Sequence, residues 1–433
     1  MENRYDKYKD SGIAWIGEIP EHWDIGYVGK YLNEVSNRNT SQKETNTLQF
    51  KMGEIVSKSD GNSKYNPESI ESYNIVYPDT IMINGLNLSF DFISQRVALV
   101  REQGAITSAY LAMKPNDNCS PNYITYLFKS YDYKKVFHAL GKGLRATLNY
   151  NIIRNELIVL PSLPEQHSIA TYLDQKCCEI DELITLQEEM ITKLQSYKQS
   201  VITEAVTKGL DKNVPLKDSG IEWIGEIPEH WEVKRLKFSC NVFGRIGFRG
   251  YKSDDLVSEG NGAITLSPSN MKDMKMDYTN RAYLSWKKYY ESPEIMISKN
   301  DILMVKTGST YGKCSFVDDI PMECTINPQI VVFKQHKDYP KFLAYSFQTK
   351  ATRAFVETSV VGGTIPTIAQ EKIMNYFFAF PPLSEQQSIA DYLDLKCSEI
   401  DELISIKQQK IEKLKDYKKS LIFECVTGKR KVS

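Results

Sequence analysis

Residues 161–208 read PSLPEQHSIATYLDQKCCEIDELITLQEEMITKLQSYKQSVITEAVTK, and the chain contains a second copy of this stretch. The second copy, residues 381–428, reads PPLSEQQSIADYLDLKCSEIDELISIKQQKIEKLKDYKKSLIFECVTG. Aligned at a shift of 220 residues (161 to 381), the copies are identical at 28 of 48 positions. An internal repeat of this length predicts two copies of one structural element.

Each copy is predicted to form one long helix, because apolar residues recur at the spacings of three and four that form a coiled-coil seam. The expected seam residues are Leu173, Ile180, Leu183 and Leu194 in the first copy, and Leu393, Ile400, Leu403 and Leu414 in the second. Two matching seams need matching partners, so we expect the helices to pack on each other as an antiparallel pair. The alternative is two unrelated amphipathic helices in separate bundles.

Polar and small residues mark the ends and the register of these helices. Gly209 and Gly428 stand where the helices are expected to end. The candidate capping boxes are Ser162 with Glu165, and Ser384 with Gln387. Gln187 and Lys407 fall at matching seam positions, where a polar residue can fix the register of a pair.

A second repeat frames the helices. Residues 9–23, KDSGIAWIGEIPEHW, recur as residues 217–231, KDSGIEWIGEIPEHW, and 14 of these 15 positions match at a shift of 208 (9 to 217). Glycine and proline exclude a helix here, so we expect a packed loop whose tryptophans fasten it to a helix end. Stacking of these aromatic rings on bases is the alternative. The order of the repeats predicts that the N-terminal loop caps the second helix, which closes a ring of pseudo-two-fold symmetry.

Two divergent segments, about residues 24–160 and 232–380, lie between the repeats. Each contains a short apolar strand before a glycine-containing turn, then a helical stretch, a polar glycine loop and a closing strand. The expected fold class is α+β, with two mixed α/β domains joined by two long antiparallel coiled-coil helices. The expected segments are 1–160 (first domain), 161–210 (first helix), 211–380 (second domain) and 381–433 (second helix).

Composition excludes few classes of protein. The 433 residues carry a net charge of −1, so a nucleic-acid partner would have to use local basic patches. No apolar run approaches the length of a membrane span, and the N-terminus is polar, so neither a membrane nor a secretory signal is expected. Eight cysteines without a CxxC pair predict reduced thiols in a cytoplasmic protein.

The catalytic motifs in the sequence are incomplete. GSTYGKC, residues 308–314, lacks one spacer residue of a phosphate-binding loop and has Cys314 in place of the hydroxyl. The tripeptide Glu232-Val233-Lys234 matches the end of a nuclease motif, but no partner aspartate stands in a strand context. The five histidines show no metal spacing. We therefore predict no catalytic residue and no metal ligand.

A surface that contacts DNA is the remaining candidate site. Arginine and lysine suit phosphates and guanine edges, whereas asparagine and glutamine suit adenine. The candidates in the first divergent segment are Asn84, Asn87, Gln95, Lys142, Arg145 and Asn149. The candidates in the second are Arg245, Arg249, Tyr251, Lys252, Lys306, Thr307, Thr310, Tyr311 and Lys313. For each of them the alternative is a solvated surface residue.

Taken together, these features resemble the specificity subunits of type I restriction–modification systems. The resemblance is carried by the W-I-G-E-I-P-x-H-W loops (15–23 and 223–231) and by the P-x-L-x-E-Q-x-x-I-A helix starts (161–170 and 381–390). The order of variable segment, helix, variable segment and helix extends it to the whole chain. Two competing hypotheses are a non-catalytic protein-binding scaffold with two adaptor modules and a stand-alone nuclease.

The resemblance implies a division of labour. Each divergent segment would read one half of a bipartite double-stranded DNA target, and the helix pair would set the gap between the halves. The helices would also bind a pair of methyltransferase subunits, and restriction (motor–nuclease) subunits would complete the complex. The chain would be no enzyme and would bind no cofactor, because S-adenosylmethionine for adenine methylation, ATP and Mg²⁺ belong to the partner subunits.

Overall fold

The computed structural model describes residues 4–58, 70–89, 95–141, 146–361 and 366–432. The chain forms two compact units, Met1–Glu188 with Gln408–Ser433, and Glu189–Lys407. The predicted long helices are present as α5 (Leu163–Lys208) and α10 (Leu383–Val426), and each contributes one part to each unit. The expected segments follow the sequence repeat, whereas the compact units divide both helices.

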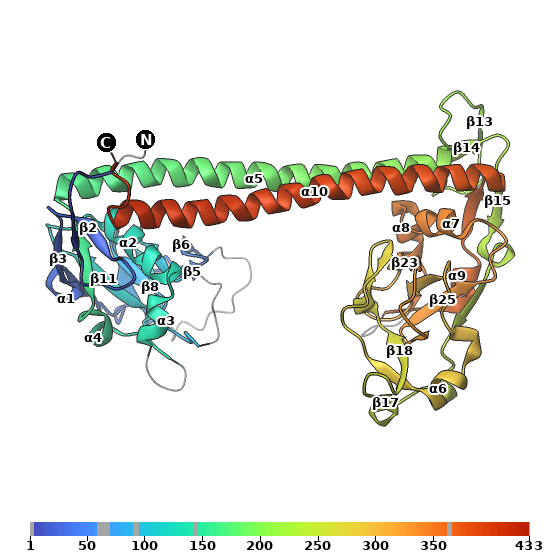
Figure 1. Ribbon diagram of the computed structural model, residues 1–433, viewed down its shortest axis with the longest axis horizontal. Helices are drawn as coiled ribbons and strands as arrows, with labels where there is room; N and C mark the ends of the chain where they lie inside the picture. Colours follow the sequence, from blue (N-terminus) through green and yellow to red (C-terminus); the bar gives the residue numbers. More distant parts are fainter. Residues whose placement is uncertain (1–3, 59–69, 90–94, 142–145, 362–365, 433) are drawn as a thin grey trace. The chain divides into compact units, whose positions relative to one another are not determined.

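Within each unit α5 and α10 lie side by side and run in opposite directions (Figure 1). In the first unit Leu173 and Ile180 of α5 share a hydrophobic core with Leu421 of α10. In the second unit Val201 of α5 shares a core with Leu393 of α10. The predicted antiparallel pairing of the two repeated helices is therefore confirmed inside each unit.

The buried seam differs from the expected one at a single pair of positions. Leu183 is 43% exposed and Leu403 is 46% exposed, so assigning them to the helix-pair interface was wrong. The neighbouring residues Ile184 and Ile404 are half-buried instead, because the seam advances by four residues from Ile180 and Ile400. The other predicted seam residues, Leu173, Ile180, Leu194, Leu393, Ile400 and Leu414, are buried or half-buried.

The predicted polar residue Gln187 is buried in the seam. Gln187 is only 3% exposed, although it is an amide surrounded by apolar seam positions. Its counterpart 220 residues later, Lys407, is half-buried. A buried polar side chain at one seam position penalises shifted pairings, so Gln187 is suited to fixing the register.

Each tryptophan loop forms a hairpin, β1 (Tyr8–Asp10) with β2 (Glu18–Pro20) and β13 (Leu216–Asp218) with β14 (Glu226–Pro228). Trp23 and Trp231 are fully buried. The Trp23 indole donates to Glu165 at the start of α5 (3.1 Å), and the Trp231 indole donates to Glu385 at the start of α10 (3.2 Å).

The predicted capping boxes are wrong. The Glu165 carboxylate binds His22 and Trp23 of the loop instead of the helix backbone. Ser384 lies inside α10, which already begins at Leu383. A glutamate near the start of each helix is thus the acceptor for its tryptophan loop.

The same tryptophans also lie against the helix ends. Gly428, just after α10, has a φ of 70°, and a Cβ there would lie 3.4 Å from Trp23. Gly209, just after α5, has a φ of 74°, and a Cβ there would lie 3.3 Å from Trp231. Each loop therefore links the end of one helix to the start of the other, as predicted for the cap of the second helix.

The divergent segments, named module 1 (residues 24–160) and module 2 (residues 232–380), contain the same antiparallel four-stranded sheet. Its order is β4-β11-β8-β9 in module 1 and β16-β25-β22-β23 in module 2. The strands of module 1 are β4 (Leu32–Glu34), β8 (Ile81–Ile83), β9 (Val97–Leu99) and β11 (Leu111–Pro115). Those of module 2 are β16 (Asn241–Gly244), β22 (Ile302–Val305), β23 (Cys314–Phe316) and β25 (Ile330–Lys334).

Further equivalent elements surround each sheet. Both modules begin and end in one two-stranded pair, β3 (Asp24–Tyr27) with β12 (Leu157–Leu160) and β15 (Glu232–Arg235) with β28 (Phe377–Phe380). The helices of module 1 are α1 (Val28–Tyr31), α2 (Pro121–Tyr133), α3 (Val136–Leu140) and α4 (Tyr150–Ile153). Those of module 2 are α6 (Trp286–Tyr290), α7 (Pro340–Ser346), α8 (Lys350–Thr358) and α9 (Gln370–Met374).

The remaining strands form two-stranded sheets in module 1, and a second four-stranded sheet with further two-stranded sheets in module 2. In module 1 they are β5 (Leu48–Lys51), β6 (Glu54–Ser57), β7 (Asn74–Val76) and β10 (Gly104–Ile106). In module 2 they are β17 (Leu256–Val257), β18 (Gly262–Leu266), β19 (Met271–Lys272), β20 (Lys275–Met276), β21 (Tyr283–Ser285), β24 (Cys324–Ile326), β26 (Val360–Val361) and β27 (Thr367–Ile368). The fold is thus two mixed α/β modules joined by two long antiparallel helices.

Candidate nucleic-acid interface

In each module two polar loops meet at the end of one inner strand of the four-stranded sheet, β8 in module 1 and β22 in module 2. In module 1 the turn after β8 is paired with the segment before α4, since the Leu148 N–H donates to the Gly85 carbonyl at 2.9 Å. In module 2 the turn after β22 is paired with the segment before α9, since the Ile368 N–H donates to the Lys306 carbonyl at 2.9 Å. Residues 148 and 368 are related by the shift of 220, so the two modules build the same loop pair.

Four of the predicted module 1 residues lie at or beside this loop pair. Asn87 is exposed at a φ of 51°. Asn84 is half-buried, and its side-chain oxygen accepts from the Leu86 N–H at 3.2 Å. Gln95 is exposed and lies against Gly53, whereas Asn149 is exposed and caps α4 by accepting from the Ile152 N–H. The predicted contacts Lys142 and Arg145 lie outside the described residues.

Arg245 of module 2 is not available for DNA, which corrects the prediction. It is only 5% exposed. Its guanidinium donates to the Ile326 carbonyl at 3.2 Å, to the Thr325 hydroxyl at 3.1 Å and to the Arg249 carbonyl at 3.4 Å. The donors that would read a base edge are therefore used inside the module, and burial lowers the pKa of this arginine.

The other candidates in the 245–252 segment surround this buried arginine. The ring of Tyr251 lies 5.3 Å from the Arg245 guanidinium, and its hydroxyl is 3.3 Å from the Thr265 hydroxyl. Arg249 is half-buried and pairs with Glu294 at 3.4 Å. Lys252 is exposed, so it keeps its place as a candidate phosphate contact.

The predicted residues in the turn after β22 differ in how exposed their side chains are. Thr310 is exposed, and Lys313 is half-buried. Tyr311 packs partly on the core of the module. Thr307 is half-buried and accepts from the Thr367 hydroxyl at 3.4 Å, and burial lowers the pKa of Lys306. Thr310 is therefore the most accessible of the predicted residues in this turn.

Module 2 also contains a polar groove that sequence reasoning missed. It has a volume of about 520 Å³ and is lined by Tyr251, Ser267, Ser269, Thr279, Asn280 and Arg281, among others. Ser269, Asn280 and Arg281 are exposed. The available signal was the density of hydroxyl, amide and guanidinium groups in SPSN (267–270) and TNR (279–281), which are the groups that contact phosphates and base edges.

Known proteins resemble this chain along most of its length. Residues 228–416 match the family model described as "Type I restriction modification DNA specificity domain". The putative type I restriction enzyme MjaX specificity subunit of Methanocaldococcus jannaschii is 26% identical over 432 residues, which is 96% of each chain. The MjaVIII specificity subunit of that organism is 23% identical and covers 96% of this chain and 94% of its own. Along almost its whole length the chain is therefore similar to type I restriction–modification specificity subunits.

Solved structures show the same fold. A chain from a structural description of complex assembly and conformational transition of the type I R-M system has a TM-score of 0.71 at 16% identity. The match covers 94% of this chain and 98% of that one. The HsdS subunit from Thermoanaerobacter tengcongensis has a TM-score of 0.52 at 17% identity and covers 95% and 98% of the two chains.

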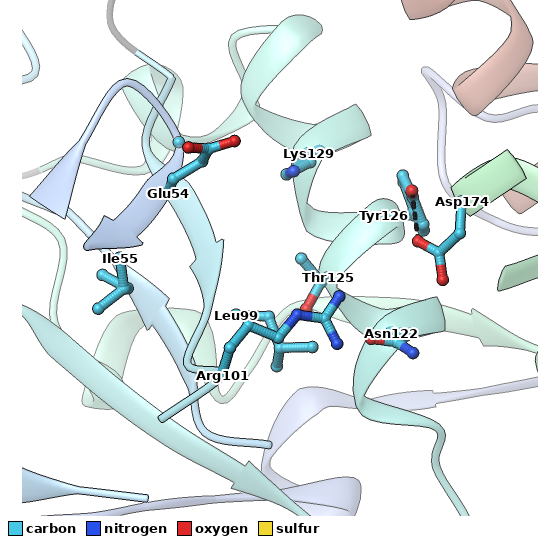
Figure 2. A pocket seen from close by; sticks show the side chains of 10 residues that line it. Glu54, Ile55, Leu99, Arg101, Asn122, Thr125, Tyr126, Lys129 and Asp174 are labelled. Carbon is cyan, nitrogen blue, oxygen red and sulfur yellow. Dashed lines mark hydrogen bonds between the residues drawn. The ribbon is translucent and has the colours of Figure 1, made fainter. Parts of the chain in front are cut away.

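A polar pocket lies at the joint between module 1 and α5 (Figure 2). It has a volume of about 300 Å³ and is lined by Glu54, Arg101, Asn122, Lys129 and Asp174, among others. The Tyr126 hydroxyl of α2 donates to Asp174 of α5 at 2.7 Å across one side. Burial, with the charge of Lys418, lowers the pKa of Lys129. A hydrogen bond thus fastens the module to the long helix.

The second unit repeats this joint with an added ion pair. The Tyr345 hydroxyl of α7 donates to Asp394 of α10 at 2.7 Å. Lys341 lies between Asp394 at 2.7 Å and Asp318 at 3.3 Å. Asp174 and Asp394 are related by the shift of 220, so both modules are attached to their helix through one equivalent carboxylate.

The described residues were expected to hold no metal site, and their helices bear on a membrane span as well. No group of three or more His, Cys, Asp or Glu side chains that could hold a metal ion occurs among the described residues. Within those residues, no helix has the length and apolarity needed to cross a bilayer. Lys234 of the nuclease-like tripeptide forms an ion pair with Asp338 at 2.8 Å, so it serves the fold of module 2.

Proposed function

We propose that this chain is the DNA-specificity subunit of a type I restriction–modification complex, in which modules 1 and 2 each read one half of a bipartite target. The observation that carries the proposal is the equivalent loop pair at the end of each sheet. The two loop pairs have the same backbone arrangement but expose different side chains, as expected for two readers of different sequences. The two related long helices hold both readers.

The helix pair acts as the ruler that sets the gap between the half-sites. Inserting one heptad into both helices at matched seam layers lengthens each by about 10 Å, which is about three base pairs of DNA. We expect the gap to grow by about that number while both half-sites stay unchanged, read from methylated sites in a DNA library. Replacing module 2 alone is the control, and it should change one half-site only. A longer gap accompanied by altered half-sites would contradict the ruler.

Exposed apolar residues on the long helices support the proposal that two methyltransferase subunits bind there. Leu183 and Leu186 of α5 are 43% and 44% exposed, and their counterparts 220 residues later, Leu403 and Ile406 of α10, are 46% and 51% exposed. Solvent-facing apolar residues that recur in both repeats are typical of two equivalent docking sites. Two copies of one methyltransferase subunit would fill them.

Native mass spectrometry of the assembled complex tests this stoichiometry. We expect the double substitution Leu183→Ser with Leu186→Ser to remove one of two methyltransferase subunits. The matched control is Glu182→Ser, an exposed residue on the same helical turn that should leave both subunits bound. Retention of both partners by the double variant would place the docking site elsewhere.

The chemistry is proposed to reside in the partners. Methyltransferase subunits would hold S-adenosylmethionine for adenine methylation, and restriction subunits would use ATP and Mg²⁺. The purified chain alone should therefore neither methylate nor cut DNA. The scaffold alternative predicts no retention on DNA, whereas a DNA reader loses affinity steeply as salt rises. Methyl transfer or metal-dependent cleavage by the chain alone would overturn the division of labour.

A further inference from the structure

A buried arginine side chain binds the backbone carbonyl groups of the turn after β8. Arg96, the residue before β9, is only 1% exposed. Its guanidinium donates to the Asn84 carbonyl at 2.9 Å, to the Leu86 carbonyl at 2.8 Å and to the Asn87 carbonyl at 3.5 Å. The guanidinium is planar and its donors point in fixed directions, so three carbonyls bound to it leave the turn little freedom.

The direction of these carbonyls determines what the turn presents. Because the carbonyls of Leu86 and Asn87 point inward to Arg96, their side chains are left facing out. Leu86 is 36% exposed, and Asn87 is exposed in the left-handed region at a φ of 51°. Arg96 is itself held in place, because its backbone N–H donates to the buried carboxylate of Asp132 in α2 at 3.0 Å.

Module 2 also has a buried arginine, but this one holds the 245–251 segment and not the turn after β22. Arg245, just after β16, ties the 245–251 segment to the end of β24 through the Ile326 carbonyl and the Thr325 hydroxyl. In the aligned strands, the position of Arg96 is taken by Lys313 in module 2, and that of Arg245 by Asn37 in module 1. Each module therefore has its own internal arginine.

We infer that Arg96 is a positioning residue for half-site reading by module 1 and that Arg245 has this role in module 2. The inference rests on the proposed function, and it adds the residues that set specificity without touching DNA. A recognition loop held in one conformation before binding presents its side chains in one register to the base edges. A loop released from its arginine samples several registers and discriminates bases less well.

The test uses the complex of the full chain with its methyltransferase subunits and a randomised DNA library. We expect Arg96→Lys, which replaces the fork of donors by a point charge, to lower base discrimination about tenfold or more in one half-site. The other half-site should stay within about twofold of the unchanged protein. Arg245→Lys should give the reverse pattern, so each variant is the other's control. Arg101→Lys, at an exposed arginine of module 1, should change neither half.

Thermal unfolding of every variant separates lost positioning from lost folding. If Arg96→Lys does not fold, Asn87→Gly replaces it, because glycine keeps the left-handed backbone and removes the presented side chain. That variant should relax the same half-site as expected for Arg96→Lys. Folded variants that leave both half-sites sharp, or that blur both equally, overturn the inference. The absence of any bipartite motif with the unchanged complex would instead overturn the proposed function.

Discussion

Modules 1 and 2 have the same central sheet, yet they differ in the strands beside it. In module 1, β10 pairs in antiparallel fashion with β7 and meets Thr47 through a parallel bridge at Ala105. In module 2, β24 pairs in parallel fashion with β18 and meets Met296 through an antiparallel bridge at Thr325. Ala105 and Thr325 are related by the shift of 220. In both modules this strand lies between one parallel and one antiparallel neighbour, but the longer pairing is antiparallel in module 1 and parallel in module 2.

The difference lies in what connects those neighbours. Module 1 inserts the β5–β6 hairpin between them, whereas module 2 inserts β19, β20, β21 and α6. The shared part attaches each module to the long helices and orients the loop pair. The inserted part can therefore vary without disturbing the sheet, which is what two readers on one frame require.

The largest effect should come from the helix-pair seam inside each unit. Leu173→Asp or Leu393→Asp buries a carboxylate at a fully buried position, so each should destabilise its own unit by more than about 4 kcal/mol. The same change at the exposed Leu183 or Leu403 should cost about 1 kcal/mol or less. Urea unfolding followed by circular dichroism measures both. Equal losses at the four positions would restore the seam expected from sequence.

The tryptophan loops should respond next, and equally in both units. Trp23→Ala and Trp231→Ala each remove a fully buried ring and a donor to a glutamate, with an expected loss of about 3–5 kcal/mol. Trp223→Ala is the control, because this 36% exposed ring only stacks on Phe355 and should cost about 1 kcal/mol. Thermal unfolding gives the comparison, and a clear inequality between Trp23 and Trp231 would show that the two loops are not equivalent.

Low pH should reduce the stability of module 2 through a group that module 1 lacks, and this effect should be smaller than those above. Burial lowers the pKa of His336 in module 2 to about 4, whereas the equivalent residue in module 1 is Asn116. The unfolded chain takes up a proton below about pH 6.5 and the folded module does not, so stability present above that pH is lost as pH falls toward 4. We expect a loss on the order of 2 kcal/mol.

His336→Asn is the matched control for this pH effect, because it gives module 2 the residue of module 1. Urea unfolding at pH 4.5 and pH 7.5 should show a smaller pH difference in the variant than in the unchanged chain. The two proteins differ only in this side chain, so other titrating groups cancel. An unchanged pH difference would mean that His336 is protonated in the folded module.

The smallest effect is expected at the ion pairs between the long helices. Lys418 binds Asp181 in the first unit and Lys198 binds Asp401 in the second, both at 2.6 Å. The carboxylates are half-exposed, so Lys418→Ala and Lys198→Ala should each cost about 0.5–1 kcal/mol, less at high salt. Lys419→Ala, which breaks a pair inside one helix, should cost less still. Unequal values for Lys418 and Lys198 would break the equivalence of the two helix pairs.

Local sequence predicted the elements of the site better than its side chains. The glycine-containing turns after β8 and β22 stand where the sequence placed them, because an apolar strand followed by a polar turn is a local pattern. The charge of Arg245 predicts a DNA contact, but its burial depends on Thr325 and Ile326, some 80 residues away. The 183/184 choice in the seam failed since both residues are apolar and only the partner helix distinguishes them.

The repeats alone determined the architecture, because two related helices with matching seams have each other as their natural partners. Tertiary structure decided which side chains remain at the surface. The Ile326 carbonyl on β24 binds Arg245 and takes it from the surface, whereas the carbonyls of the turn after β8 bind Arg96 and leave the Asn87 side chain exposed. Such distant contacts follow from the packing of the sheet, and no local pattern in the chain encodes them.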